Sequence, residues 1–149
     1  MSRKLDLIVV DDDSAVCEAI SEIIKSFYCW GDVLSFTDIG KAIAYCRGMQ
    51  AGIALFVVDV YLGEESCFNF LDAIADKFPM IFQDTIVVTG NASNDVVNMC
   101  VASNINYLIE KPIRVYSLQL AVRAIISKYI LFAKRLLEDP DFAESVAQV

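Results

Sequence analysis

Apolar segments of strand length alternate along this chain with longer segments in which apolar positions recur at helical spacing. The strand-length runs cover residues 5–10, 32–36, 53–58, 85–88 and 107–109, and most are rich in β-branched side chains. The helical segments cover residues 14–27, 37–47, 67–78, 93–103 and the stretch from 115 onward. This alternation is typical of a parallel sheet with helices on both faces. The pattern therefore predicts an α/β domain of (βα)5 type, with a doubly wound five-stranded parallel sheet.

Start and stop signals support the predicted helices. Asp13 or Ser14, residues 37–38 and Ser93 stand where three helices should begin, and their side-chain oxygens can accept backbone N–H groups. Gly48, Pro79 and Asn104 stand where helices should end.

The last helix continues beyond the length that the sheet can cover. Its apolar positions keep helical spacing from Val115 to about Glu138, which gives a helix of about 35 Å. The overhanging half needs a partner chain or packing on its own domain, and a homodimer through this helix is one expectation. The acidic tail after it is expected to fray, because Pro140 stops the helix. We assign residues 1–127 to the core domain and 128–149 to a C-terminal helix extension and acidic tail.

The composition narrows the chemistry before any motif is considered. A chain of 149 residues with 56% hydrophobic and 21% charged residues fits one folded domain rather than a disordered segment. The chain contains no histidine. This excludes Ser-His-Asp and Cys-His catalysis, HExxH zinc sites, His-ligated haem and an imidazole-based pH switch.

Charge and cysteine usage favour a cytoplasmic protein that binds neither nucleic acid nor a membrane. The formal charge of −8 repels a phosphate backbone, and no basic patch offsets it. The five cysteines are odd in number and never form a CxxC pair, so we expect small core residues rather than a disulfide framework or zinc ribbon. The N-terminus lacks the features of a signal peptide, and no uncharged apolar stretch of about 18 residues occurs.

Polar side chains follow the predicted strands at positions that a doubly wound sheet brings to one edge. They are Asp11, Asp12 and Asp13 after the first strand, Asp59 after the third, Thr89 after the fourth and Lys111 after the fifth. Converging carboxylates repel one another unless a cation is present, and Mg²⁺ prefers oxygen ligands while keeping positions for phosphate oxygens. We therefore expect Asp12 and Asp59 to bind Mg²⁺ directly, with Asp11 reaching it through water. Lys111 and Thr89 could then contact a phosphoryl group.

The strings LIVVDDD, FVVDVYL, IVVTG and YLIEKP together resemble the receiver domain of two-component response regulators. The resemblance covers roughly residues 4–127, and the spacings of 30 positions from Asp59 to Thr89 and 22 from Thr89 to Lys111 agree with that family. Each motif is weak alone, but their order and placement at strand ends are specific in combination. The resemblance implies a flavodoxin-like fold.

The family resemblance also implies a phosphoryl-transfer mechanism. Asp59 would attack a phosphohistidine on a sensor histidine kinase or phosphotransfer protein and form an aspartyl phosphate. Asp11, Asp12, Asp59 and the backbone carbonyl of Tyr61 would hold Mg²⁺. Lys111 would pair first with Asp59 and then with a phosphoryl oxygen, and the cis bond before Pro112 would aim it. The Thr89 hydroxyl would swing toward the phosphoryl group and carry its loop along, which is the signal.

Two features depart from the family pattern. The position three before Lys111, usually an aromatic residue that moves with the threonine, is Leu108, while Tyr107 should point to the other face of the sheet. The loop after Asp59 has Gly63 where the family often has proline, followed by two glutamates.

Other functions fit parts of the same pattern. The triplet at Asp11–Asp13 could be a helix cap, or the DxD of a haloacid-dehalogenase-like phosphohydrolase, but no acidic pair follows Lys111 as that hydrolase would require. A receiver-like interaction module that works without phosphorylation is the remaining alternative. Too few residues follow the core for a DNA-binding domain, so the output should pass to an unknown downstream protein. Both a complete protein and a fragment of a longer regulator are compatible with the sequence.

Overall fold

The computed structural model describes residues 4–148 and arranges them around one five-stranded sheet. Its strands are β1 (Leu7–Val10), β2 (Val33–Phe36), β3 (Leu55–Asp59), β6 (Thr85–Thr89) and β7 (Tyr107–Glu110). They lie in the order β2-β1-β3-β6-β7, and every neighbouring pair is parallel. The strand order reverses at β1 and β3, so the predicted doubly wound sheet is confirmed, with its switch point between these two strands.

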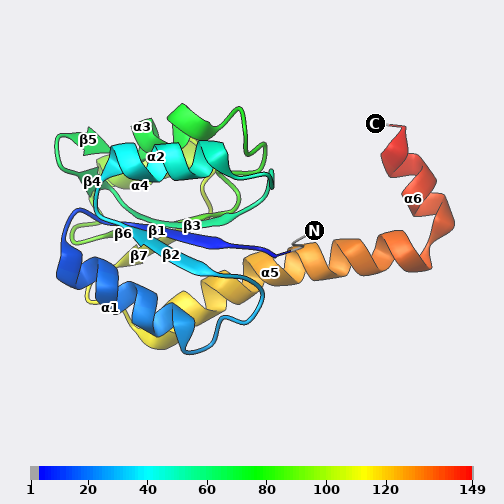
Figure 1. Cartoon of the computed structure of the whole chain (residues 1–149), viewed down its shortest axis with the longest axis horizontal. Coiled ribbons are helices and arrows are strands. Elements are labelled where there is room, and N and C mark those ends of the chain that lie inside the picture. Colours follow the sequence, from blue (N-terminus) through cyan, green and yellow to red (C-terminus); the bar gives the residue numbers. More distant parts are fainter. Residues whose placement is uncertain (1–3, 149) are drawn as a thin grey trace.

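Helices cover both faces of the sheet (Figure 1). On one face lie α1 (Ser14–Lys25) and α5 (Val115–Glu138), and on the other lie α2 (Ile39–Gly48), α3 (Cys67–Ile74) and α4 (Asn94–Ala102). The central strands are apolar on both sides because alternate residues face different helices. Leu7 and Val9 pack in the core under α1 and α5, whereas Ile8 and Val10 pack in the core under the other three helices.

The predicted helix caps are largely confirmed. The side chains of Asp13, Asp38 and Ser93 accept backbone N–H groups at the starts of α1, α2 and α4. The α3 helix ends four residues earlier than expected, at Ile74, and a series of turns leads from there to β6. The sequence pattern also missed a small antiparallel hairpin, β4 (Tyr61–Leu62) with β5 (Glu65–Ser66), which directly follows β3. Gly63 makes its turn possible, because its φ of 66° is unfavourable for other residues.

The C-terminal part of the chain corrects one expectation and confirms another. The α5 helix runs to Glu138 as expected and projects beyond the sheet (Figure 1). The acidic tail, however, is not frayed but forms a helix, α6 (Pro140–Ala147). Pro140 ends α5 and at the same time occupies the first turn of α6, where its missing N–H costs nothing, and the Asp139 carboxylate caps that turn. The α6 helix packs back on α5 through an edge-to-face contact of Phe142 with Phe132.

By length and composition alone, α5 could cross a membrane, and 28% of the window that meets this test is buried in the structure. Its first half buries Leu118, Val122 and Ile125 against the sheet. A helix with one face buried in its own domain passes the same test, so this is weak support for a membrane span.

The cysteines agree with the expectation of small core residues, with one exception. Cys17, Cys46, Cys67 and Cys100 are buried and unpaired, and Cys29 is exposed. Residues 1–3 of the expected core domain and residue 149 of the expected tail lie outside the described residues.

Candidate functional site

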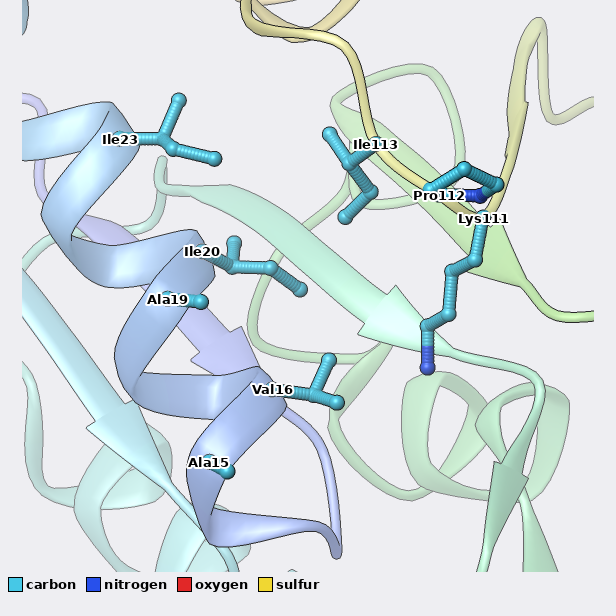
Figure 2. A pocket seen from close by; sticks show the side chains of 8 residues that line it. All are labelled: Ala15, Val16, Ala19, Ile20, Ile23, Lys111, Pro112 and Ile113. Atoms are coloured by element: carbon cyan, nitrogen blue, oxygen red, sulfur yellow. The ribbon is translucent and has the colours of Figure 1, made fainter.

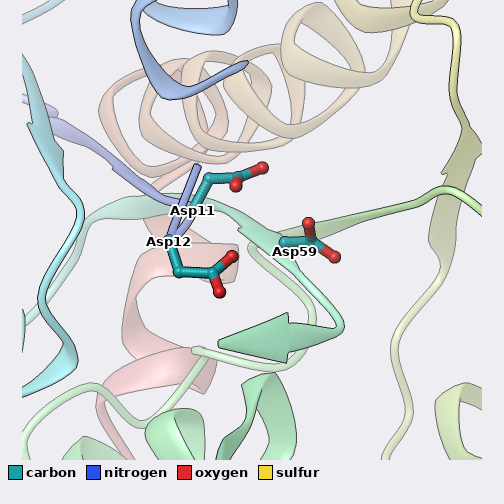
Figure 3. Close-up of side chains that lie close together, drawn as sticks. All are labelled: Asp11, Asp12 and Asp59. Atoms are coloured by element: carbon teal, nitrogen blue, oxygen red, sulfur yellow. The ribbon is translucent and has the colours of Figure 1, made fainter. Parts of the chain in front are cut away.

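Three carboxylates converge where β1 and β3 end (Figure 3). Parallel pairing of Val10 with Val58 sets the ends of the two strands side by side, so Asp11 and Asp12 leave β1 next to Asp59. One oxygen of each carboxylate lies within 4.8 Å of the others. Asp11 is 1% exposed, the Asp59 side chain is 12% exposed, and Asp12 is exposed to solvent. The sequence prediction that these side chains meet is confirmed by this geometry.

Backbone amides fix the direction of each carboxylate. Asp11 Oδ1 accepts the N–H of Asp13 at 2.9 Å, and Asp59 Oδ1 accepts the N–H of Tyr61 at 3.3 Å. Asp12 Oδ2 accepts the N–H of Gly63 at 3.1 Å, which joins the β1 end to the turn of the β4–β5 hairpin. This contact of Asp12 was not predicted, because the two residues are far apart in the sequence and the hairpin itself was missed.

Lys111 closes the carboxylate cluster from the β7 side. Its Nζ donates to Asp59 Oδ2 at 2.8 Å and to Asp11 Oδ2 at 3.2 Å, and its side chain is 23% exposed. The peptide bond from Lys111 to Pro112 is cis, as expected. The backbone N–H of Lys111 also donates to the carbonyl of Thr89 at 2.8 Å, so the lysine is tied to the end of β6.

Burial and charge act in opposite directions on these groups. Burial raises the pKa of the Asp11 carboxyl above its ordinary value, even though the Asp13 amide and Lys111 favour its ionised form. Burial would lower the pKa of Lys111, but its hydrogen bond to Asp59 and the charges of Asp11 and Asp59 raise the pKa overall. The Lys111 ammonium is therefore the positive charge that balances the carboxylates of Asp11 and Asp59.

Thr89 is fully buried at the end of β6, and its hydroxyl is bonded to its own loop. Thr89 Oγ1 donates to the carbonyl of Asn91 and accepts the N–H of Asn91, both at 3.2 Å. The following residue is held from β7, because Ala92 N–H donates to Glu110 Oε2 at 2.9 Å. Glu110 was not singled out by the sequence, since a glutamate at a strand end carries no signal for a specific loop contact.

Tyr107 and Leu108 point to opposite faces of the sheet, as the two-residue period of a strand predicts. Leu108 packs against the core under α2, α3 and α4, and Tyr107 packs against the core under α1 and α5. The residue on the α4 side, three positions before Lys111, is therefore aliphatic.

An apolar groove of about 370 Å³ lies beside Lys111 (Figure 2). Val16, Ile20 and Ile23 line it from α1, and Pro112 and Ile113 line it from the loop after β7. In Figure 2 the side chains of the two elements face each other across this space, with the Lys111 ammonium at one end.

The donor set fits a hard divalent cation. The three clustered ligands are carboxylate oxygens, which Mg²⁺ prefers, and neither sulfur nor imidazole is among them. Tyr61, whose carbonyl was expected as a further ligand, begins β4 two residues after Asp59.

Comparisons with known proteins agree with the fold and show the family. The model of the response regulator receiver domain family matches residues 7–123. The transcriptional regulatory protein CitT of Halalkalibacterium halodurans is 22% identical over the whole chain, and the chain spans 64% of the length of that relative.

Solved receiver domains have the same fold. A receiver domain protein from Clostridium thermocellum superposes with a TM-score of 0.74 at 18% identity, covering 86% of this chain and 98% of that one. A response regulator from Thermotoga maritima gives a TM-score of 0.67 at 26% identity, covering 83% and 98%. The beryllofluoride-activated NtrC4 receiver domain dimer gives 0.70 at 22% identity, again covering 83% and 98%. The chain therefore belongs to the response regulator receiver domain family.

Proposed function

We propose that this receiver domain accepts a phosphoryl group on Asp59 from a phosphohistidine of a sensor histidine kinase or phosphotransfer protein. The observation that carries the proposal is the position of the Asp59 carboxylate, which contacts Lys111 and belongs to the acidic cluster at once. Asp11 is more deeply buried, and Asp12 bonds to the Gly63 amide whereas Lys111 donates to Asp11 and Asp59. Asp59 alone combines partial access with contacts to both parts of the site.

In the proposed reaction an Asp59 oxygen attacks the phosphorus, and the P–N bond to the imidazole breaks. The products are an aspartyl phosphate and a histidine that takes up a proton. Residues 1–149 contain no histidine, so the donor imidazole would lie outside this sequence, or a small phosphodonor would replace it.

Asp11, Asp12 and Asp59 would hold Mg²⁺, with the Tyr61 carbonyl as a further ligand. The ion would neutralise charge on the phosphoryl oxygens. Lys111 would exchange its bond to Asp59 for one to a phosphoryl oxygen, for which its 2.8 Å contact already positions it. The Thr89 hydroxyl would leave Asn91 and donate to another phosphoryl oxygen, and the loop from 89 to 92 would move with it.

The apolar groove between α1 and the loop after β7 supports a helical partner on this side of the site. A protein that brings a phosphohistidine to Asp59 must cover the surface around Lys111, and the groove begins at this lysine (Figure 2). Its lining of Val16, Ile20 and Ile113 suits the apolar face of a kinase or phosphotransfer helix.

The output surface would lie on the opposite side of the site, on α4, β7 and α5. Val101 on α4 and Leu120 on α5 are exposed there. A change in the loop before α4 would alter this face directly, and an unknown downstream protein would recognise it. We further propose that the chain acts in the cytoplasm, as the sequence indicates.

Self-association through α5 is part of the same proposal. Leu131 and Leu137 are 65% and 86% exposed on the part of α5 that projects beyond the sheet. The α6 helix covers a different part of α5 through Phe142, so these leucines stay uncovered within one chain. A similar receiver domain has been solved as a dimer in its beryllofluoride-activated form. Sedimentation velocity with and without beryllofluoride tests this, and a monomer in both conditions would remove the dimer.

Incubation with a small phosphodonor and Mg²⁺ tests the proposed function. We expect stoichiometric labelling of the chain, as intact mass shows, that is lost on chelation of Mg²⁺ and in Asp59→Asn. Continuous release of phosphate from a monoester would instead support a dehalogenase-like hydrolase. Absence of any adduct would support the interaction module that works without phosphorylation.

A further inference from the structure

Glu110 connects the end of β7 to the loop that follows β6. Its Oε2 accepts the N–H of Ala92 at 2.9 Å, and Glu110 is paired in the sheet with Thr89. Thr89, in turn, bonds to Asn91 through its hydroxyl. The neighbouring loop residues Asn91 and Ala92 are thus held by different strands. The Thr89 side chain of β6 bonds to Asn91, and the Glu110 side chain of β7 bonds to Ala92.

Packing contributes little to holding the tip of this loop. Gly90 and Asn91 are exposed, and a side chain built at Gly90 would meet no atom within 4 Å. The loop is short, since α4 begins at Asn94 with its cap at Ser93. The hydrogen bonds to Thr89 and Glu110 therefore set the position of residues 90–92.

We propose that Glu110 is a positioning residue that holds the β6–α4 loop in its resting arrangement and so opposes activation. This inference rests on the proposed function. When the Thr89 hydroxyl turns toward a phosphoryl group, Asn91 is released and the adjacent Ala92 is drawn away from Glu110. A contact made only in the resting state shifts the equilibrium toward that state and weakens every ligand that requires the activated one.

The size of the effect follows from the type of bond. The contact is exposed to solvent, which weakens it, so we expect it to change an equilibrium by about two- to tenfold. Removing it should raise the affinity for beryllofluoride, which mimics the phosphoryl group on Asp59, by about the same factor. The acceptor is a carboxylate, and charge-assisted bonds are stronger than neutral ones, so a glutamine should keep part of the restraint.

The experiment measures beryllofluoride binding to the full chain in the presence of Mg²⁺ for the wild type, Glu110→Ala and Glu110→Gln. Glu144→Ala is the matched control, because it removes the same charge from α6, far from the site. Hydrogen exchange at the Ala92 amide provides a second measurement, made without beryllofluoride. We expect tighter binding and faster Ala92 exchange in Glu110→Ala, intermediate values in Glu110→Gln, and wild-type values in the control.

Each other outcome overturns the inference in a different way. Wild-type affinity in Glu110→Ala would show that the contact does not oppose activation. Equal gains in Glu110→Ala and Glu110→Gln would show that the carboxylate acts through its charge alone. If the wild type does not bind beryllofluoride, the proposed function fails, and unchanged Ala92 exchange in Glu110→Ala would show separately that the restraint itself is absent.

Discussion

Replacing Lys111 by methionine should destabilise the metal-free protein and make it more dependent on Mg²⁺. The substitution keeps the length of the apolar stem and removes the ammonium that contacts Asp59 and Asp11. Asp11 is 1% exposed, so its charge would stay in a buried place without its partner. Asp59 would then face Asp11 without an intervening cation.

Two estimates of the cost agree. Removing one partner of a buried ion pair costs about 3–5 kcal/mol, and the partial exposure of Lys111 places this case at the lower end. Two carboxylate oxygens 4.8 Å apart repel by about 3.5 kcal/mol at an effective dielectric constant of about 20, and Lys111 offsets this repulsion in the wild type. We therefore expect Lys111→Met to lower the free energy of unfolding by about 3 kcal/mol when Mg²⁺ is chelated.

Mg²⁺ should recover much of this loss, because it supplies the positive charge that the lysine provided. Binding at about ten times the dissociation constant stabilises a protein by about 1.4 kcal/mol. The gain should exceed that of the wild type, in which Lys111 competes with the ion for Asp59 and Asp11. The double variant Asp59→Asn with Lys111→Met should lose less stability than Lys111→Met alone, since one of the repelling charges is gone.

Urea unfolding at neutral pH, with chelator or with magnesium chloride, measures these differences. Trp30 is the single tryptophan and packs against Tyr28 with ring centroids 5.3 Å apart, so its fluorescence reports unfolding of the core. It precedes β2, whereas the site follows the ends of the parallel strands β1 and β3, so it should not sense the ion directly. Equal stability of the wild type and Lys111→Met under chelation, or an equal response of both to Mg²⁺, would refute the electrostatic account.

Three further predictions concern groups outside the site. Asp84 is 1% exposed and bonds to Lys128 and Tyr129 of α5. Asp84→Ala should therefore lower the free energy of unfolding by about 2 kcal/mol, and an unchanged urea midpoint would refute this. Burial raises the pKa of Cys46 from 9.0 to about 11, so the unfolded chain loses this proton first and stability falls as pH rises between these values. By about pH 10 the contribution of Cys46 to this loss is about 1.4 kcal/mol. Cys46→Ala should reduce the fall in unfolding free energy by this amount and leave the part due to the other buried thiols such as Cys67, and an unchanged fall would refute this. A thiol reagent should modify Cys29 alone in the native protein, and rapid reaction of a second thiol would contradict the buried positions of the others.

The sequence predicts the sheet and the acidic cluster because both depend on strong local signals. Buried parallel strands are continuous apolar runs, and polar residues that end them meet at one edge of the sheet, which is why Asp11, Asp59 and Lys111 could be placed together before the structure was known. The opposite directions of Tyr107 and Leu108 follow in the same way from the two-residue period of a strand.

Features that depend on contacts between distant residues could not be predicted. The bonds of Asp84 with Lys128 and Tyr129 join residues 44 and 45 positions apart and have no periodic signal. The β4–β5 hairpin has strands of two residues, too short for a pattern. The α6 helix, by contrast, has a local signal in the sequence. Asp139 followed by Pro140 is a good helix start, because proline both ends the preceding helix and fits the first turn of the next one.

The most direct test of the account identifies the residue that carries the phosphoryl group. After incubation with acetyl phosphate and Mg²⁺, borohydride reduction converts an aspartyl phosphate to homoserine, and peptide mass spectrometry locates the change. The account predicts reduction at position 59 alone, with none after chelation of Mg²⁺ or in Asp59→Asn. Reduction at Asp11 or Asp12, or an unmodified chain under conditions in which Mg²⁺ binds, would contradict it.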